Sequence, residues 1–308
     1  VNPFYGRDII SIKDFTRRDL EALFSYADRI ESLPAREKRE LASGKILASL
    51  FYEPSTRTRL SFESAMQAIG GGVVGFAEPS VSSVGKGENL ADTVRVVSSY
   101  VDLMVLRHPR EGAARFAAEV ADKPIVNAGS GTEEHPTQAM LDLYTIVREK
   151  GVVDGLRIGV MGDLRYGRTV YSLLYALSNY NPRVYLISPP ELKVRSEVLL
   201  DLQDKLRLTE HKSLDEVIAE LDVLYVTRIQ KERFPDPEEY KKVKGSYIVD
   251  LSILDKSKED LIVLHPLPRI DEVKPEVDSS PKAKYFLQAK LGVVIREAIL
   301  ALILNPEF

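Results

Sequence analysis

Residues 46–63 read ILASLFYEPSTRTRLSFE, an apolar run that passes directly into a helical pattern. The first seven residues predict a buried strand, and Phe62, Ala65, Met66 and Ile69 then follow the i, i+3, i+4, i+7 spacing of an amphipathic helix. The same alternation of short apolar runs and amphipathic stretches recurs along the chain. It predicts an α/β fold of two doubly wound domains, each with a central, mainly parallel sheet flanked by helices.

Nine apolar runs are strand candidates, and a helix predicted over 136–149 divides them into two groups. The first group lies at 46–52, 73–76, 101–106 and 124–126. The second group lies at 156–161, 183–187, 222–226, 246–250 and 261–264. The final helix, at about 286–304, is apolar around much of its surface, so we expect it to be buried by returning to the first domain. The predicted domains are residues 1–134 plus 292–308 and residues 135–291.

Composition excludes several classes of protein. The 308 residues are 44% hydrophobic and 29% charged, which describes a globular chain long enough for two domains. A net charge of −4 argues against a nucleic-acid partner. There is no cysteine, and the four histidines form no close pair, so we predict no metal and no cofactor. No apolar run approaches the ~20 residues of a membrane helix, and the first residues lack a signal peptide's apolar core, so we expect a cytoplasmic protein.

The segment Glu53–Glu63 carries the strongest local signal for chemistry. Ser55 is a good N-cap for the following helix, whose first backbone N–H groups have no intrahelical acceptor. A phosphate placed there would meet these donors, the positive end of the helix dipole, the hydroxyls of Thr56 and Thr58, and the Arg57 guanidinium. An ordinary capped surface helix is the alternative.

A loop at residues 80–88, SVSSVGKGE, places Lys86 between two glycines. Such a loop can carry a cation into a site because glycine permits backbone conformations that other residues avoid. An exposed flexible turn fits the same residues.

Three of the four histidines stand directly before a proline, which keeps each of them out of the α region. We predict that His108 and His265 end strands and that His135 opens a helix. Strand ends next to helix starts line the ligand crevice of open α/β sheets. Arg107, His135 and Gln138 are therefore candidate polar contacts, although any one His-Pro pair fits a structural histidine.

Residues 162–169, GDLRYGRT, follow a predicted strand and open a helix. The pattern departs from a phosphate-binding P-loop at Arg168, which stands where that loop needs lysine. A planar guanidinium suits a carboxylate, so we predict a carboxylate clamp at Arg168 and a similar fork at Arg228, with a surface arginine as the alternative for each. In HPLPR, at 265–269, a cis Leu267–Pro268 bond would aim backbone carbonyls inward at an amine or amide.

These residues provide cationic anchors, a phosphate cradle and one well-placed histidine, without an activated nucleophile or a metal cluster. Such a set suits two anionic substrates that are held together for direct transfer.

In this order, STRTRLSFE, the glycine-flanked lysine, RHP, HPTQ, GDLRYGR, TRIQKER and HPLPR resemble the catalytic chains of the aspartate carbamoyltransferase family, over essentially the whole chain. The sister ornithine enzymes typically carry His-Cys-Leu-Pro where this chain has HPLP. The loop SSVGKGE is one residue shorter than the family form, which has two consecutive lysines. Lys86 is therefore the sole lysine candidate, and Ser83 is the predicted serine, with Ser82 as the alternative.

The resemblance implies substrate-binding roles in both domains. The residues that would hold the phosphate and carbamoyl group of carbamoyl phosphate are Ser55, Thr56, Arg57, Thr58, Arg107, His135 and Gln138. Those that would bind and orient L-aspartate are Arg168, Arg228 and Gln230. The Leu267 carbonyl, with Pro266 beside it, would bind the carbamoyl amide, and a neighbouring subunit of a homotrimer would supply Ser83 and Lys86. Of all these, the implied catalytic residues are Arg57, Thr58, Lys86, Arg107 and His135.

The implied reaction is attack of the neutral aspartate amine on the carbamoyl carbon through a tetrahedral intermediate, giving N-carbamoyl-L-aspartate and phosphate, an early step of de novo pyrimidine biosynthesis. The resemblance also raises a zinc-bearing regulatory chain as a partner, with the zinc held by that partner because this chain has no cysteine. Three alternatives stay open: transfer to ornithine or another amine, a P-loop nucleotide hydrolase, and a non-catalytic binding subunit of the same fold.

Overall fold

The computed structural model describes residues 2–78, 80, 82–132, 134–229, 236–243 and 247–307, and the chain divides into two compact units. Unit 1 comprises Val1–Leu141 and Lys290–Phe308, and unit 2 comprises Asp142–Ala289. The divisions fall inside two continuous helices, α6 (Pro136–Lys150) and α11 (Tyr285–Leu304), which contribute residues to both units. The boundaries expected from the sequence, 134/135 and 291/292, differ from these because the interior of a helix carries no turn signal.

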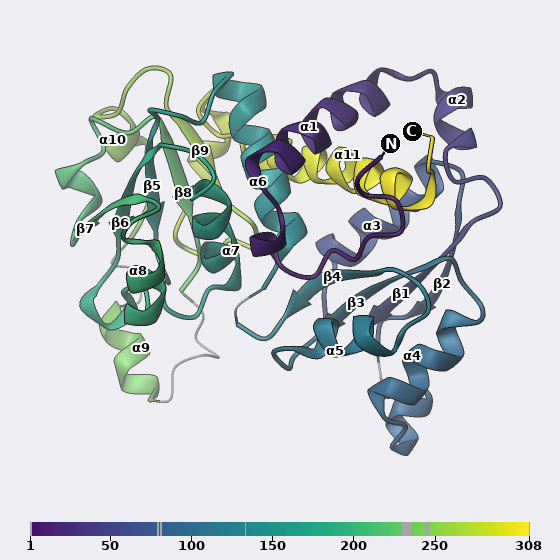
Figure 1. The fold of residues 1–308 in the computed structure, drawn as a ribbon. Helices are drawn as coiled ribbons and strands as arrows, with labels where there is room; N and C mark the ends of the chain where they lie inside the picture. Colours follow the sequence, from purple (N-terminus) through teal and green to yellow (C-terminus); the bar gives the residue numbers. More distant parts are fainter. Residues whose placement is uncertain are drawn as a thin grey trace. The chain divides into compact units, whose positions relative to one another are not determined.

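Unit 1 is built on a four-stranded parallel sheet of order β2-β1-β3-β4 (Figure 1). Its strands are β1 (Ile46–Phe51), β2 (Gly72–Phe76), β3 (Leu103–His108) and β4 (Ile125–Ser130). Its other helices are η1 (Ile12–Asp14), α1 (Arg17–Ser32), α2 (Ala35–Glu40), α3 (Arg57–Ala68), η3 (Ser83–Lys86), α4 (Leu90–Ser98) and α5 (Ala113–Val120). Figure 1 shows α1, α3 and α11 on one face of this sheet and α4 and α5 on the other. Because both faces are covered, β1, β3 and β4 are buried along most of their length.

The core of unit 1 follows the hydrophobic pattern of the sequence. Phe62, Ala65, Met66 and Ile69 are fully buried, as their helical spacing predicts. On the opposite face of the sheet, strand residues pack with α4 and α5, and this cluster includes Ala48, Leu50, Met104, Leu106, Ile125, Val94, Ala114 and Ala117.

Helix α11 is largely buried, as predicted, although it carries charged side chains. Its Arg296 donates hydrogen bonds to the Ser61 hydroxyl at 3.0 Å and the Thr137 hydroxyl at 3.1 Å, and its Glu297 forms an ion pair with Lys38 of α2 at 2.9 Å. These contacts tie α11 to α2, α3 and α6 within unit 1. Within the described ranges, no helix is both long and apolar enough to cross a membrane.

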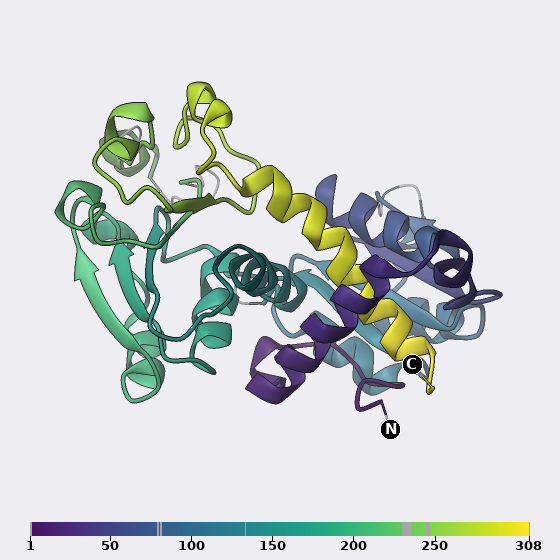
Figure 2. The same ribbon diagram turned by 90° about the horizontal axis from the view of Figure 1, so that it is seen from above.

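Unit 2 holds a five-stranded parallel sheet of order β7-β6-β5-β8-β9, with helices on both of its sides (Figure 2). Its strands are β5 (Arg157–Met161), β6 (Arg183–Ile187), β7 (Arg207–His211), β8 (Val223–Val226) and β9 (Ile262–Leu264). Its helices are α7 (Arg168–Leu177), η4 (Pro190–Leu192), α8 (Ser196–Leu202), η5 (Leu214–Glu216), α9 (Pro237–Val243), α10 (Leu251–Leu254) and η7 (Pro275–Ser279). One core cluster joins Met161, Leu224 and Val263 of the strands to Leu254 of α10 and Val277 of η7.

Two features of the second sheet differ from the sequence prediction. The predicted strand at 246–250 is wrong for its described residues, 247–250, where Val249 makes only an isolated bridge to Val273 and Asp250 caps α10. Strand β7 was not predicted, because its sequence, RLTEH, contains only one strongly apolar residue. It lies at the edge of the sheet, where most of its side chains are exposed. The other predicted strands are confirmed, with ends shifted by a few residues.

Candidate functional site

In unit 1, the carboxyl ends of β1 and β3 meet at one edge of the sheet. Phe51, the last residue of β1, is the register partner of Arg107, and the N–H of Tyr52 donates to the Arg107 carbonyl at 2.8 Å. The chain that leaves β1 therefore begins its turn into α3 directly beside Arg107. Parallel strands place their carboxyl ends at the same edge, where open α/β sheets bind ligands.

The Arg107 guanidinium links the residues of this edge. Its Nε donates to Glu53 Oε1 at 2.9 Å, and one terminal nitrogen contacts the Ser55 hydroxyl at 3.3 Å, the Thr58 hydroxyl at 3.4 Å and the Ala128 carbonyl at 3.4 Å. The arginine and glutamate side chains are only 13% and 20% exposed, so solvent screens this ion pair weakly. The structure thus brings together Ser55, Thr58 and Arg107, which the sequence predicts as site residues. The sequence alone indicates no role for Glu53 or for the Ala128 carbonyl.

The first turn of α3 presents donors to the same edge. The expected N-cap at Ser55 is wrong: Thr56 holds the cap position, in helical conformation and without a side-chain capping bond, while Ser55 lies one residue earlier and contacts Arg107. Arg57 is exposed and Thr58 is buried. The N–H groups at the start of a 12-residue helix carry a partial positive charge, so this turn favours an anion.

His135 and Gln138 lie at the start of α6, where β4 turns into the helix. The turn is closed by paired backbone bonds between Ser130 and Glu134, and the Glu134 carboxylate accepts a hydrogen bond from Ser11 at 2.8 Å. The His135 carbonyl accepts the Gln138 N–H at 3.1 Å, which begins the helix as predicted. Both side chains are buried, at 4% and 8% exposure.

The predicted site residues Ser83 and Lys86 lie in the segment that follows β2, the edge strand of the unit 1 sheet. Ser82 caps the short helix η3 by accepting the Val84 N–H at 3.3 Å, and the helix ends at Gly87 with a φ of 97°. Ser83 and Lys86 are exposed. Ser82 is partly buried, and the assignment of Ser83 as the site serine stays a prediction.

In unit 2, two arginines follow neighbouring parallel strands. Arg168 begins α7, and the turn before it is held by Asp163, whose carboxylate accepts the N–H groups of Arg165 at 3.1 Å and Tyr166 at 2.9 Å. Arg228 lies two residues beyond β8, the neighbour of β5 in the sheet. Gly162 has a φ of 121°, and a Cβ there would lie 2.2 Å from the Thr227 carbonyl oxygen, so only glycine lets these two strand ends approach. Gln230, the third predicted aspartate contact, lies outside the described residues.

Pro266 and Leu267 follow β9, the next strand after β8 in the sheet, and both are partly buried. The Leu267–Pro268 peptide is cis, one of the two isomers that a bond to proline permits. Leu267 has a φ of 59°, and it is the one described non-glycine residue with a positive φ. A leucine in this conformation is sterically strained, which marks the segment as a candidate functional backbone.

The electrostatic character of the unit 1 edge suits an anion. Burial lowers the pKa of His108, Arg110 lowers it further, and Glu53 opposes both, so the imidazole beside Arg107 is neutral at pH 7. Its Nδ1 accepts the Arg110 N–H at 3.1 Å. The cationic donors there are therefore arginines, which stay charged at all relevant pH values. No cluster of three potential metal ligands occurs among the residues that the structure describes.

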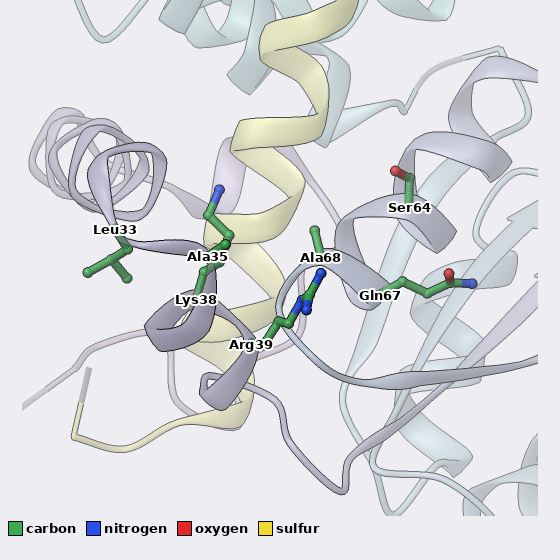
Figure 3. A pocket seen from close by; sticks show the side chains of 7 residues that line it. All are labelled: Leu33, Ala35, Lys38, Arg39, Ser64, Gln67 and Ala68. Atoms are coloured by element: carbon green, nitrogen blue, oxygen red, sulfur yellow. The ribbon is translucent and has the colours of Figure 1, made fainter.

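A separate hollow of about 510 Å³ lies between α2 and the C-terminal half of α3 (Figure 3). Its polar lining comes from Lys38, Arg39, Ser64 and Gln67, and Lys38 is engaged by Glu297. The motif residues of α3 lie in its first turn, so this hollow does not contain them.

Two family models cover most of the chain. The carbamoyl-phosphate-binding domain of the aspartate/ornithine carbamoyltransferases matches residues 7–148, and their aspartate/ornithine-binding domain matches residues 154–303. The chain belongs to the aspartate/ornithine carbamoyltransferase family. The first match contains the predicted contacts Ser55, Thr56, Arg57, Thr58, Arg107, His135 and Gln138. The second contains the predicted aspartate contacts and also Pro266 and Leu267.

The relatives and solved structures that are similar to this chain carry the names of aspartate enzymes. The aspartate carbamoyltransferase catalytic subunit of Cenarchaeum symbiosum is 60% identical over 302 residues, which is 98% of each chain. The aspartate transcarbamoylase catalytic subunit of M. jannaschii is 50% identical, with a TM-score of 0.89 over 96% of this chain and 97% of that one. The Trypanosoma cruzi aspartate transcarbamoylase, solved with carbamoyl phosphate and aspartate, is 41% identical, with a TM-score of 0.93 over 99% and 98% of the two chains.

Proposed function

We propose that this protein transfers the carbamoyl group of carbamoyl phosphate to L-aspartate, giving N-carbamoyl-L-aspartate and phosphate in pyrimidine biosynthesis. The observation that carries the proposal is the arrangement around Arg107. Its guanidinium is oriented by Glu53 and touches the hydroxyls of Ser55 and Thr58 at the anion-attracting start of α3. An arginine fixed beside a helix N-terminus and two hydroxyls matches a phosphate monoanion or dianion better than any neutral ligand.

Unit 1 supplies the contacts of the phosphate and of the carbamoyl oxygen, and unit 2 supplies those of the aspartate carboxylates. In unit 1, the first turn of α3 holds the phosphate, and Arg107, Thr58 and His135 donate hydrogen bonds or charge to the carbamoyl oxygen. These groups stabilise the oxygen as it becomes an oxyanion in the tetrahedral intermediate. In unit 2, Arg168 and Arg228 bind the aspartate carboxylates through their planar forks.

The proposed chemistry is a direct displacement. The lone pair of the neutral aspartate amine forms the new C–N bond at the carbamoyl carbon, and the C–O bond to phosphate then breaks. The leaving phosphate acts as the base that takes a proton from the attacking amine. Positioning and charge stabilisation supply the rate, because the residues assigned to the site include no activated nucleophile.

We also propose that the protein works as a homotrimer in which Ser83 and Lys86 of one subunit complete the site of the next. Both residues are exposed and follow the edge strand β2, so a neighbouring chain could reach them.

A zinc-bearing regulatory chain is a further proposed partner. The doubly charged substrate does not cross membranes unaided, which favours a cytoplasmic reaction; cell fractionation tests this.

The decisive assay offers carbamoyl phosphate to the purified protein with L-aspartate or L-ornithine in separate reactions. We expect carbamoyl aspartate and phosphate to form in equal amounts, with no product from ornithine. Product from ornithine would refute the roles of Arg168 and Arg228. A folded sample inactive with both amines would support a non-catalytic binding subunit.

Shared sites are tested by mixing two inactive variants. Arg57→Ala removes a phosphate contact within one subunit, and Lys86→Gln removes the residue proposed to act on the neighbour. If sites are shared, trimers re-formed from both variants contain some sites with neither defect, so activity returns. Absence of any return, with mixed trimers demonstrated by mass spectrometry, would mean that each subunit carries a complete site.

A further inference from the structure

Helix α11 carries an arginine, Arg296, that lies buried within unit 1 and that the proposed mechanism does not use. Only 3% of this residue is exposed. A guanidinium keeps its positive charge at every relevant pH, and a buried charge without partners is strongly unfavourable. The contacts of Arg296 therefore indicate which parts of unit 1 it holds.

The two terminal nitrogens of Arg296 reach two different helices. Nη1 donates to the Ser61 hydroxyl of α3 at 3.0 Å, and Nη2 donates to the Thr137 hydroxyl of α6 at 3.1 Å. The guanidinium also lies over the ring of Phe62, with its Cζ 4.7 Å from the ring centroid. Thr137 and Phe62 are fully buried, so water competes little for these contacts.

Both hydroxyls lie close to turns that the proposed function assigns to carbamoyl phosphate. Ser61 follows Thr58 by three residues, so the two are neighbours on the surface of α3. Thr137 lies in the first turn of α6, between His135 and Gln138. The guanidinium thus joins the N-terminal end of α3, with its phosphate donors, to the N-terminal end of α6, with contacts for the carbamoyl group.

Strand pairing alone does not set the distance between these two helix ends. Helix α3 follows β1 and α6 follows β4, and β3 lies between these two strands in the sheet. Ladder hydrogen bonds fix the strands, whereas the segments that lead from strands into helices are more variable. A planar guanidinium holds its N–H groups in a fixed fork, so two acceptors bonded to it are kept at a set distance. Arg296 therefore fixes a distance that strand pairing leaves open.

Helix α11 also packs closely against α6 near Arg296. A Cβ at Gly292 would lie 3.0 Å from the Leu141 side chain and 3.4 Å from Arg296 Nη1. A side chain at this position would have to displace its neighbours, because the interior is already close-packed. This packing leaves the guanidinium little room to turn away from Thr137.

We propose that Arg296 is a positioning residue that sets the distance between the N-terminal turns of α3 and α6, so that donors of both turns reach one molecule of carbamoyl phosphate. The inference rests on the proposed function, because it explains how the phosphate and carbamoyl contacts of unit 1 are kept together. It predicts that a ligand that needs both turns depends on Arg296. Inorganic phosphate, which needs only the α3 turn, does not.

The first test removes the two acceptors of the fork one at a time. Ser61→Ala and Thr137→Val each leave one arm of Arg296 without its hydroxyl, and neither changes a residue assigned to substrate. The matched controls keep the same chemistry on the same helices. Ser64→Ala changes an exposed serine of α3 that lines the hollow of Figure 3, and Thr145→Val changes a fully buried threonine further along α6.

Binding of carbamoyl phosphate and of inorganic phosphate is measured by titration calorimetry on the wild type, the single variants and the double variant. We expect Ser61→Ala and Thr137→Val each to raise the Kd of carbamoyl phosphate about 3- to 10-fold, the effect of one hydrogen bond, and that of phosphate less than about twofold. Because either substitution breaks the same bridge, the double variant should bind within about twofold of the weaker single variant. The controls should change neither Kd.

Several outcomes would overturn the proposal. Losses that multiply in the double variant would mean two independent local effects. A parallel rise of the Kd for both ligands would mean a general structural role, and no change for either would mean that the bridge has no effect on binding.

A second variant tests the fork itself. Arg296→Lys keeps the charge but replaces the fork by a single ammonium group, which cannot hold two hydroxyls at a set distance. It should show the same selective loss, and wild-type affinity for carbamoyl phosphate would contradict the proposal. If Arg296→Lys does not fold, the two hydroxyl variants, which leave the arginine in place, decide alone.

The wild-type protein separates this inference from the proposed function. A wild type that forms no carbamoyl aspartate refutes the proposed function. An active wild type whose variants lose affinity for both ligands alike refutes only the positioning role of Arg296.

Discussion

We expect Glu53 to hold the Arg107 guanidinium in its orientation, and so to affect kcat/KM, without contacting substrate itself. Replacing it with alanine removes the acceptor of the 2.9 Å bond to Arg107 Nε, the shortest of the contacts described for this guanidinium. A hydrogen bond between charged groups contributes about 1.5–3 kcal/mol, which corresponds to about 10- to 150-fold in an equilibrium. Because the remaining contacts of the guanidinium are 3.3–3.4 Å long, they hold it less firmly.

We therefore expect Glu53→Ala to lower kcat/KM for carbamoyl phosphate by about 10- to 100-fold, measured at saturating aspartate. Glu53→Gln keeps a neutral acceptor, and neutral bonds are about half as strong, so its loss should be about 3- to 10-fold. Glu63→Gln is the control, because Glu63 pairs with Arg59 on α3 at 3.1 Å and has no part in the proposed site. Activity of Glu53→Ala within twofold of the wild type, or a larger loss in Glu53→Gln than in Glu53→Ala, would refute this reasoning.

Three further changes test other parts of the structure. Thr58→Val removes a hydroxyl that contacts Arg107 at 3.4 Å and should lower kcat/KM by about 3- to 10-fold, with little change in Tm; an unchanged kcat/KM would remove Thr58 from the site. Gly162→Ala places a Cβ 2.2 Å from the Thr227 carbonyl oxygen and should lower the free energy of unfolding, measured by denaturant titration, by at least about 3 kcal/mol. The control Gly155→Ala, at a φ of 78° with open space around it, should lower the same free energy by about 1–2 kcal/mol. Because burial lowers the pKa of His108, the unfolded state binds this proton more tightly, so wild-type stability should fall as the pH drops below about 6.5. In His108→Asn this part of the decline in Tm should disappear, and identical pH profiles would contradict the assignment.

Most secondary structure could be predicted because it depends on local pattern. Helix α3 follows from the spacing of Phe62, Ala65, Met66 and Ile69, and these residues are buried as expected. The turn before Arg168 was predictable because a glycine-bounded segment separates an apolar run from a helix. Strand β7 was not predicted, and the strand predicted at 246–250 is wrong for its described residues. Both errors arise because the pairing of a short strand depends on its neighbours rather than on its own hydropathy.

The charged residues, the segments that end strands or begin helices, and the family that the motifs resemble can all be read from the amino-acid sequence. Which of these residues come into contact depends on the tertiary structure. Arg107 contacts Ser55 and Thr58 across 52 and 49 residues of chain, and Glu53 orients it, because β1 and β3 pair in parallel register. In unit 2, the Leu267 N–H donates to His265, and His265 bonds Glu272, at a turn where Leu267 has a φ of 59° that its sequence does not predict. The physical reason is that side-chain periodicity is a short-range property, whereas register and buried hydrogen bonds are set by the packing of the whole unit.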